Sequence, residues 1–332
     1  MKAIDISNNM VVSVVKKNRG ILLVLLLIGI ILSIQSPFFL TYDNQITVLR
    51  QITNNMYLAL GMALVMILGG IDLSVGAIVA MCGTLTVGFI VTNHLPIWLA
   101  IVLGLSLGTL LGLINGMLIS FFKVPAFIIT LASMNIARGV AYIYSGGQST
   151  RIMDEGFNAI GTGYIGFLPL PVLYMIILIV LFIILLNKTR FGTYIYAVGG
   201  NRESAHLSGV PIKKVEIMVY TISGFLAAFA GLVLCSRMYS GQPSIGGGYE
   251  MDAIAACVLG GVSMSGGVGR ISGTIFGVMI IGIISNGLNL MNVSSYWQLV
   301  VKGLIIAIAV LIDAQKGKKS FIHKLFARKT AA

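Results

Sequence analysis

Long apolar runs separated by short polar or glycine-rich breaks dominate the chain. A hydrocarbon core of about 30 Å needs roughly 20 apolar residues of helix to cross it, and most runs approach that length. Lipid cannot satisfy backbone N–H and C=O groups, and the runs lack the alternation of barrel strands, so we expect helices. The expected spans lie near 20–37, 52–69, 74–92, 97–120, 126–144, 171–187, 215–236, 252–268, 272–291 and 296–313. The pattern predicts an all-α, polytopic transmembrane helical bundle of about ten spans.

Composition agrees with this location. Of the 332 residues, 57% are hydrophobic and 10% are charged, whereas a soluble domain carries roughly 25% charged residues. The 40 glycines suit close contact between membrane helices, which small residues permit. Gly104, Gly108, Gly112 and Gly116 recur every fourth residue and so share one helical face. We expect this face to pack within the chain, with a contact between subunits as the alternative.

The distribution of basic residues predicts the orientation. With the N-terminus in the cytoplasm, most Lys and Arg residues gather in the N-terminal segment 1–19, in the long loop 187–214 and in the tail 314–332. The outer loops contain only Arg50, Arg151 and Arg237. This bias places both termini in the cytoplasm and makes 20–313 one transmembrane domain in a cell membrane.

Two other interpretations of the positive charge are disfavoured. The basic residues form no stripe with interleaved aromatic residues, so nucleic acid is not an expected partner. The apolar run Ile21–Ile34 follows Lys16, Lys17 and Arg19, as in a signal peptide, but no small-residue cleavage site follows it. We expect an uncleaved first span in contact with membrane lipid.

The cytoplasmic loop Asn187–Lys214 contains a candidate for energy coupling. It is far longer than a helical hairpin needs. Its centre predicts a short helix that begins after an Asn cap and ends at a Gly. Such a helix could dock on a cytoplasmic ATPase and pass on its movement, or the loop could simply be solvated, and the residues alone leave both open. The candidate coupling residues are Asn201, Arg202, Glu203, Ala205, His206 and Gly209.

Two pairs of glycines predict breaks in helices, because paired Gly disfavours regular helix. These pairs are Gly69 with Gly70 and Gly260 with Gly261. Asp72 follows the first pair, where its carboxylate is expected to cap the next helix rather than bind substrate. Ionisable groups at membrane depth are costly and should face a partner, a cavity or an interface. Besides Asp72, the candidates are Arg138, Asp252 and Lys302.

A neutral polar solute that crosses the bundle would need a path lined by uncharged side chains that form hydrogen bonds. Amide and hydroxyl side chains within expected spans are the candidates for this lining, and hydrogen bonding between helices is the competing interpretation. The residues are Asn115, Asn135, Ser285, Asn286 and Asn289.

Other chemistries have little support in the sequence. The phosphate-binding pattern G-x-x-x-x-G-K-[ST] does not occur, so the chain is not expected to hydrolyse ATP. His94, His206 and His323 do not cluster with carboxylates or cysteines as a metal site or catalytic triad requires. The three cysteines fall in or beside apolar runs and are expected to be packing residues. We expect no catalytic residues, no metal and no cofactor bound by this chain.

Several stretches resemble the permeases of ribose-type ABC sugar importers. They are GGIDLSVG (Gly69–Gly76), NKTRFGTYIYAVGGN (Asn187–Asn201), SGV (Ser208–Val210), YEMDAIAACVLGGVSMSGGVGRISGT (Tyr249–Thr274), NGLNL (Asn286–Leu290) and VSSYWQ (Val293–Gln298). The resemblance covers nearly the whole chain. It implies a homodimeric pore, a cytoplasmic subunit with two fused ATP-binding modules that holds ATP and Mg, and an extracytoplasmic sugar-binding protein. It also favours the coupling interpretation of 201–209, but it does not fix the sugar.

The alternative function is a self-sufficient secondary carrier or channel for a small polar solute. Such a protein would need carboxylates or broken helices at mid-depth to bind a coupling ion. Few acidic residues lie at that depth in the expected spans. The sequence therefore favours the subunit of an ATP-driven importer of a ribose-like monosaccharide.

Overall fold

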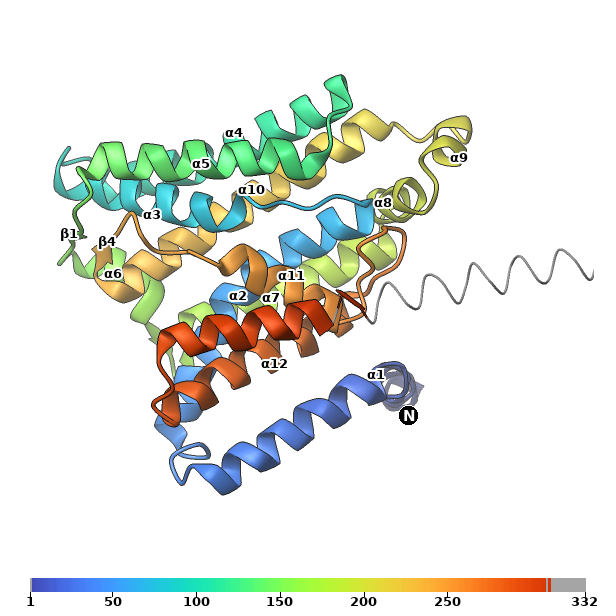
Figure 1. Ribbon diagram of the computed structural model, residues 1–332, viewed down its shortest axis with the longest axis horizontal. Helices are drawn as coiled ribbons and strands as arrows, with labels where there is room; N and C mark the ends of the chain where they lie inside the picture. Colours follow the sequence, from blue (N-terminus) through green and yellow to red (C-terminus); the bar gives the residue numbers. More distant parts are fainter. Residues whose placement is uncertain (1, 309, 312–332) are drawn as a thin grey trace, which may run out of the picture.

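The computed structural model describes residues 2–308, 310 and 311, and this part of the chain is mostly helical (Figure 1). Within it, seven helices are long and apolar enough to cross a membrane. They are α1 (Lys2–Gln35, apolar from Asn18), α2 (Tyr42–Leu68), α4 (Ile97–Phe122), α5 (Ala126–Ser145), α7 (Leu170–Lys188), α10 (Ile212–Met238) and α12 (Ile271–Leu290). The expected multi-pass helical membrane protein is confirmed. The basic tail 314–332 lies outside the described residues.

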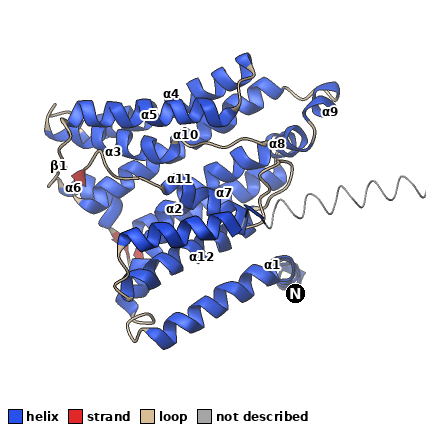
Figure 2. Ribbon diagram, viewed as in Figure 1, coloured by secondary structure: helices blue, strands red, loops and turns tan. Residues whose placement is uncertain are grey.

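The remaining elements are shorter. Two apolar helices, α3 (Val75–Val91) and Ser295–Ile308, fall below the length of a full span. The short helices are α6 (Glu155–Thr162), α8 (Arg190–Gly200), α9 (Arg202–Leu207) and α11 (Tyr249–Leu259). The strands are β1 (Thr150–Arg151), β2 (Tyr164–Ile165), β3 (Leu168–Pro169) and β4 (Ser240–Gly241), which form two antiparallel pairs, β1 with β4 and β2 with β3 (Figure 2).

Helices α2 and α10 form the centre of the bundle. Every residue of α2 from Ile52 to Leu68 is buried, and α10 packs against α2, α3 and α4. In Figure 1, α3, α4 and α5 lie on one side of this centre, whereas α11, α12 and α1 lie on the other. The glycines at 104, 108, 112 and 116 are all buried within the chain. A Cβ on Gly112 would overlap the carbonyl oxygen of Tyr220 in α10, so the expected packing within the chain is present.

Large apolar side chains cover much of the outer surface. Ile34 in α1 is 80% exposed and Ile143 in α5 is 83% exposed. In water such a surface would aggregate, but lipid tails are as apolar as these side chains. The exposed faces of α1, α4, α5 and α7 therefore suit contact with a bilayer.

Three element boundaries differ from those expected. Helix α2 begins at Tyr42, so Arg50 lies inside it rather than in an outer loop. The long loop 187–214 contains a second helix, α8, before the expected α9. The expected span at 252–268 is helical only to Leu259, because the glycine-rich segment after it turns away from helix. Apolar composition alone did not reveal that α11 is a half-length helix.

Candidate coupling surface and transport path

The segment between α7 and α10 folds into two short capped helices. The side chain of Thr189 accepts a hydrogen bond from the Gly192 N–H at 3.1 Å and begins α8. The side chain of Asn201 accepts from the Ser204 N–H at 2.8 Å and begins α9. After α9, Gly209 adopts φ +79°, a conformation that suits glycine, and redirects the chain into α10. The expected short helix between Asn201 and Gly209 is present.

Helix α8 is attached to both glycine-rich breaks. The Gly267 N–H donates to the Ile67 carbonyl at 2.8 Å, which joins the segment after α11 to the end of α2. Gly199 lies against this junction, where a Cβ would overlap the Ile67 oxygen. The Tyr196 hydroxyl donates to the Gly269 carbonyl at 2.8 Å. Burial raises the pKa of Tyr196, so this hydroxyl keeps its proton at neutral pH.

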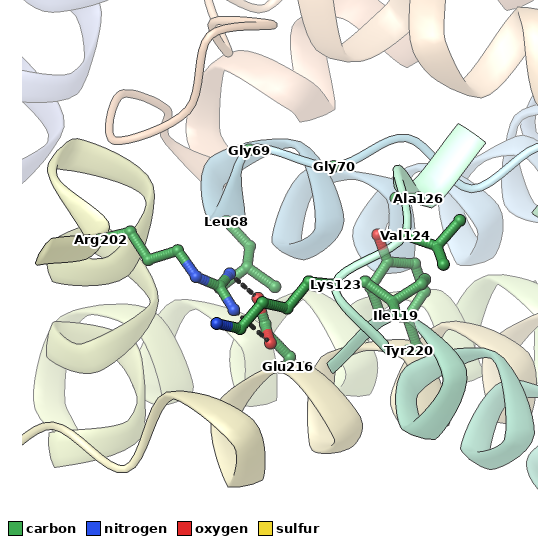
Figure 3. A pocket seen from close by; sticks show the side chains of 10 residues that line it. All are labelled: Leu68, Gly69, Gly70, Ile119, Lys123, Val124, Ala126, Arg202, Glu216 and Tyr220. Carbon is green, nitrogen blue, oxygen red and sulfur yellow. Dashed lines mark hydrogen bonds and ion pairs between the residues drawn. The ribbon is translucent and has the colours of Figure 1, made fainter. Parts of the chain in front are cut away.

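Helix α9 is attached to α10 by an ion pair. Arg202 pairs with Glu216 through both terminal guanidinium nitrogens, and the Nη2 to Oε2 distance is 3.1 Å. The Glu216 side chain is 4% exposed, whereas that of Arg202 is 50% exposed. Figure 3 shows Arg202 from α9 and Lys123 from the end of α4 both pointing toward Glu216. They border a cavity of about 310 Å³ under the Gly69–Gly70 break.

The two faces of α9 differ in exposure. Ala205 is buried at 4% exposure and anchors the helix on the bundle. Leu207 is 84% exposed, and Glu203 and His206 are also exposed. Helix α9 therefore directs Glu203, His206 and Leu207 away from the bundle, while Ala205 and the Arg202–Glu216 ion pair hold its other face.

Asp72 lies at the centre of a buried polar network between α2 and α3. One carboxylate oxygen accepts from the Ser74 N–H at 3.0 Å and from the Ser74 hydroxyl at 2.5 Å. The other accepts from the Ser223 hydroxyl of α10 at 2.7 Å. Ser74 accepts from Asn115 at 3.3 Å, and Asn115 accepts from Ser133 of α5. The carboxylate therefore ties the start of α3 to three other helices.

The other ionisable groups at depth also have partners. Arg138 of α5 donates to the carbonyls of Pro243 and Ile245 at 2.8 and 2.6 Å. These carbonyls belong to the non-helical segment before α11, and such backbone is tolerated at membrane depth only where protein groups satisfy it. Lys302 forms an ion pair with Asp252 of α11 at 2.7 Å.

The starts of α3 and α11 meet inside the bundle. A Cβ on Gly76 would overlap the Gly246 carbonyl oxygen and the Glu250 carboxylate. Each helix is preceded by an extended or turned segment, which reaches the interior between longer helices (Figure 1). The Glu250 carboxylate therefore lies where the first turns of two helices meet.

The five amide and hydroxyl candidates do not gather at one place. Asn115 belongs to the Asp72 network, and Asn286 exchanges hydrogen bonds with Asn44 at 2.8 and 3.2 Å. Ser285 is buried beside Asn286. Asn135 and Asn289 are exposed; Asn135 donates to its own helix, and Asn289 accepts from Gln298. Helices α4 and α12 lie on opposite sides of the bundle (Figure 1).

Sequence reasoning did not identify Glu216, Tyr196 or Ser223 as partners of the candidate site. Glu216 had a visible signal, since it is the one acidic residue in the first turns of a basic helix start. The contacts of Tyr196 and Ser223 join segments that are far apart in the chain, so no signal in the sequence could have revealed them. Among the described residues, no group of three or more His, Cys, Asp and Glu side chains could hold a metal ion.

These features define a multi-pass helical membrane protein in which the α8–α9 unit is attached to several of the long helices. A family described as the branched-chain amino acid transport system permease component matches residues 44–310. The chain is 47% identical over 304 residues to the ribose import permease protein RbsC of Bacillus subtilis, which covers 91% of this chain and 94% of that protein.

Two further relatives are almost as similar. The chain is 42% identical over 307 residues to RbsC of Escherichia coli K12, covering 90% of this chain and 94% of that protein. It is 42% identical over 299 residues to the L-arabinose transport system permease protein AraH of the same organism, covering 90% and 91%. No solved structure matches the chain. The chain belongs to this permease family and is of the ribose type found in ABC importers.

Proposed function

We propose that this chain forms the membrane path of an importer that carries a ribose-like monosaccharide, driven by ATP hydrolysis on a separate cytoplasmic subunit. The proposal is supported by the names of the relatives, which are ribose and arabinose permeases. It is supported equally by the α8–α9 unit, which is anchored on several long helices and leaves an exposed face.

The proposed assembly contains two copies of this chain, a tandem ATP-binding subunit that holds ATP and Mg, and an extracytoplasmic sugar-binding protein. Both termini and α9 lie in the cytoplasm, in agreement with the basic residues. We propose that three shorter helices also lie in the membrane: α3, Ser295–Ile308 and the half-length α11. Together with the seven long helices they would give about ten membrane segments. The protein lies in the cell inner membrane.

In the proposed mechanism, closure of the ATPase displaces α9 as a rigid body. The Arg202–Glu216 pair passes this displacement to α10, and the α8 contacts with Ile67 and the 267–269 segment pass it to α2 and α12. Tight packing makes such helices move as units rather than deform. Asn201 and Gly209 set the position of α9 through its caps, and Glu203 and His206 contact the ATPase.

The sugar path is proposed to pass the exposed amide of Asn135. This residue lies one helical turn before Arg138, which donates to the segment before α11. Asn289 is a second candidate, because it is also exposed. Asn115, Ser285 and Asn286 are assigned to contacts between helices, because Asn115 and Asn286 are already bonded to other side chains and Ser285 is buried.

Transport in proteoliposomes tests the proposal. Vesicles with this chain, its ATPase and its binding protein are expected to accumulate radiolabelled ribose only when ATP is present on the ATPase side. L-Arabinose and galactose in parallel measure the sugar preference. Accumulation by this chain alone, on a proton or sodium gradient, would instead establish the secondary carrier.

A further inference from the structure

A second cavity lies at the proposed cytoplasmic end of the bundle, between α9 and the ends of α4 and α10. Its volume is about 680 Å³. Its charged residues are mainly basic, Lys123, Arg202, Lys213 and Lys214 against one acid, Glu203, and the imidazole of His206 lies beside them. We call this cavity the basic groove.

Among the described residues, the three lysines of the basic groove form no ion pair, although the Lys123 side chain points toward Glu216, which is already paired with Arg202 (Figure 3). All three lysines are exposed. The Lys213 ammonium lies 4.8 Å from the centre of the Phe121 ring. The groove can therefore accept an anion without first breaking an ion pair of a lysine.

An apolar row leads along α4 to the basic groove. Leu110, Ile114, Met117 and Phe121 are 51, 41, 42 and 55% exposed. Their spacing of four, three and four residues keeps them on one helical face. Phe121 contacts Lys213, so the row ends at the groove. The groove itself adds apolar surface from Val210 and Ile212.

We propose that the basic groove binds an anionic phospholipid of the cytoplasmic leaflet, with its phosphate between the lysines and an acyl chain along the α4 row. Basic pockets between membrane helices on the cytoplasmic side hold such headgroups. A soluble phosphate ester would satisfy the lysines but would leave the α4 row unused. An acidic surface of the ATPase would also ignore the row, so the combination favours a lipid.

Native mass spectrometry of the purified full-length permease tests the site without any transport step. We expect long-chain phosphatidylglycerol to bind more tightly than phosphatidylcholine with the same chains. The double variant K213Q/K214Q should lose roughly tenfold or more of the affinity for phosphatidylglycerol. The matched control K188Q/R190Q removes two exposed cytoplasmic charges outside the groove and should retain it. Because transport is not measured, failure of the importer proposal would leave this result unaffected.

Three outcomes would overturn the lipid site. Equal loss of lipid binding in both double variants would show general charge attraction only. Competition by glycerol 3-phosphate at the affinity of the long-chain lipid would assign the groove to soluble phosphate esters. Unchanged lipid binding in K213Q/K214Q together with lost ATPase binding would assign it to the ATPase.

Discussion

Arg202 and Glu216 join the short helix α9 to the central helix α10. Glu216 is almost completely buried, so removal of its partner leaves a carboxylate without compensation. A charge-assisted hydrogen bond of this kind contributes about 2 kcal/mol. The pair therefore links α9 to α10, although Arg202 is half exposed.

Charge reversal tests this link. Arg202→Glu should lower ATP-driven sugar uptake by about tenfold, because two carboxylates repel where the pair was. ATP hydrolysis by the assembled complex should continue. The exchange R202E/E216R restores opposite charges and should recover much of the uptake. Equal uptake by the single variant and the wild type would contradict the link.

Asp72 carries a different role, since all its contacts are structural. Asp72→Ala leaves the Ser74 N–H and the Ser223 hydroxyl unpaired in the interior. This should lower the free energy of unfolding by about 2–4 kcal/mol and reduce the melting temperature in detergent. Asp43→Ala, at an exposed position of α2, is the control. A melting temperature unchanged by the loss of Asp72 would refute the network.

At the scale of helices, the contact between α4 and α10 depends on the absence of side chains. Gly108 and Gly112 of α4 lie directly against Gly224 of α10, so the two backbones touch. Without a hydrophobic driving force in lipid, this close contact provides much of the attraction between helices.

A larger residue at this contact should separate the helices. Gly112→Leu is expected to cost about 3 kcal/mol or more, because its side chain would collide with backbone atoms of α10. Gly29→Leu in α1, where a Cβ meets nothing within 4 Å, is the control. The melting temperatures of the two variants provide the measurement. Equal stability would show that α4 and α10 do not pack as described.

The sequence predicted those elements that depend on local chemistry. Asn201 and Gly209 mark the ends of α9 through caps, and the spacing of Gly104 to Gly116 marks a packing face. The pair Gly260–Gly261 marked a helix break where α11 ends after Leu259, but hydropathy extended the expected span to 268, because the glycine-rich segment is as apolar as a span. The contacts of Arg138 with Pro243 and Ile245 also depend on tertiary structure alone.

At the scale of the whole molecule, one surface unit is connected to the long central helices. The α8–α9 unit contacts the end of α2, the segment before α12, and α10. The opposite end of the bundle contains α6 and the paired strands β1 and β4 (Figure 1). A force applied to α9 would therefore reach helices that extend through the bundle. This arrangement suits a subunit moved from one side by a separate motor.

Thiol labelling of α9 measures this arrangement most directly. The starting variant has Cys82, Cys235 and Cys257 replaced by Ala. In it, Leu207→Cys presents one thiol at an 84% exposed position of α9, and Phe167→Cys presents one at an 82% exposed position between β2 and β3, which the proposed orientation places on the outer side of the membrane. A membrane-impermeant maleimide should label position 167, but not 207, in intact cells. In inside-out vesicles it should label position 207, and the bound ATPase should protect that thiol. Labelling of position 207 in intact cells, or no protection by the ATPase, would contradict the account.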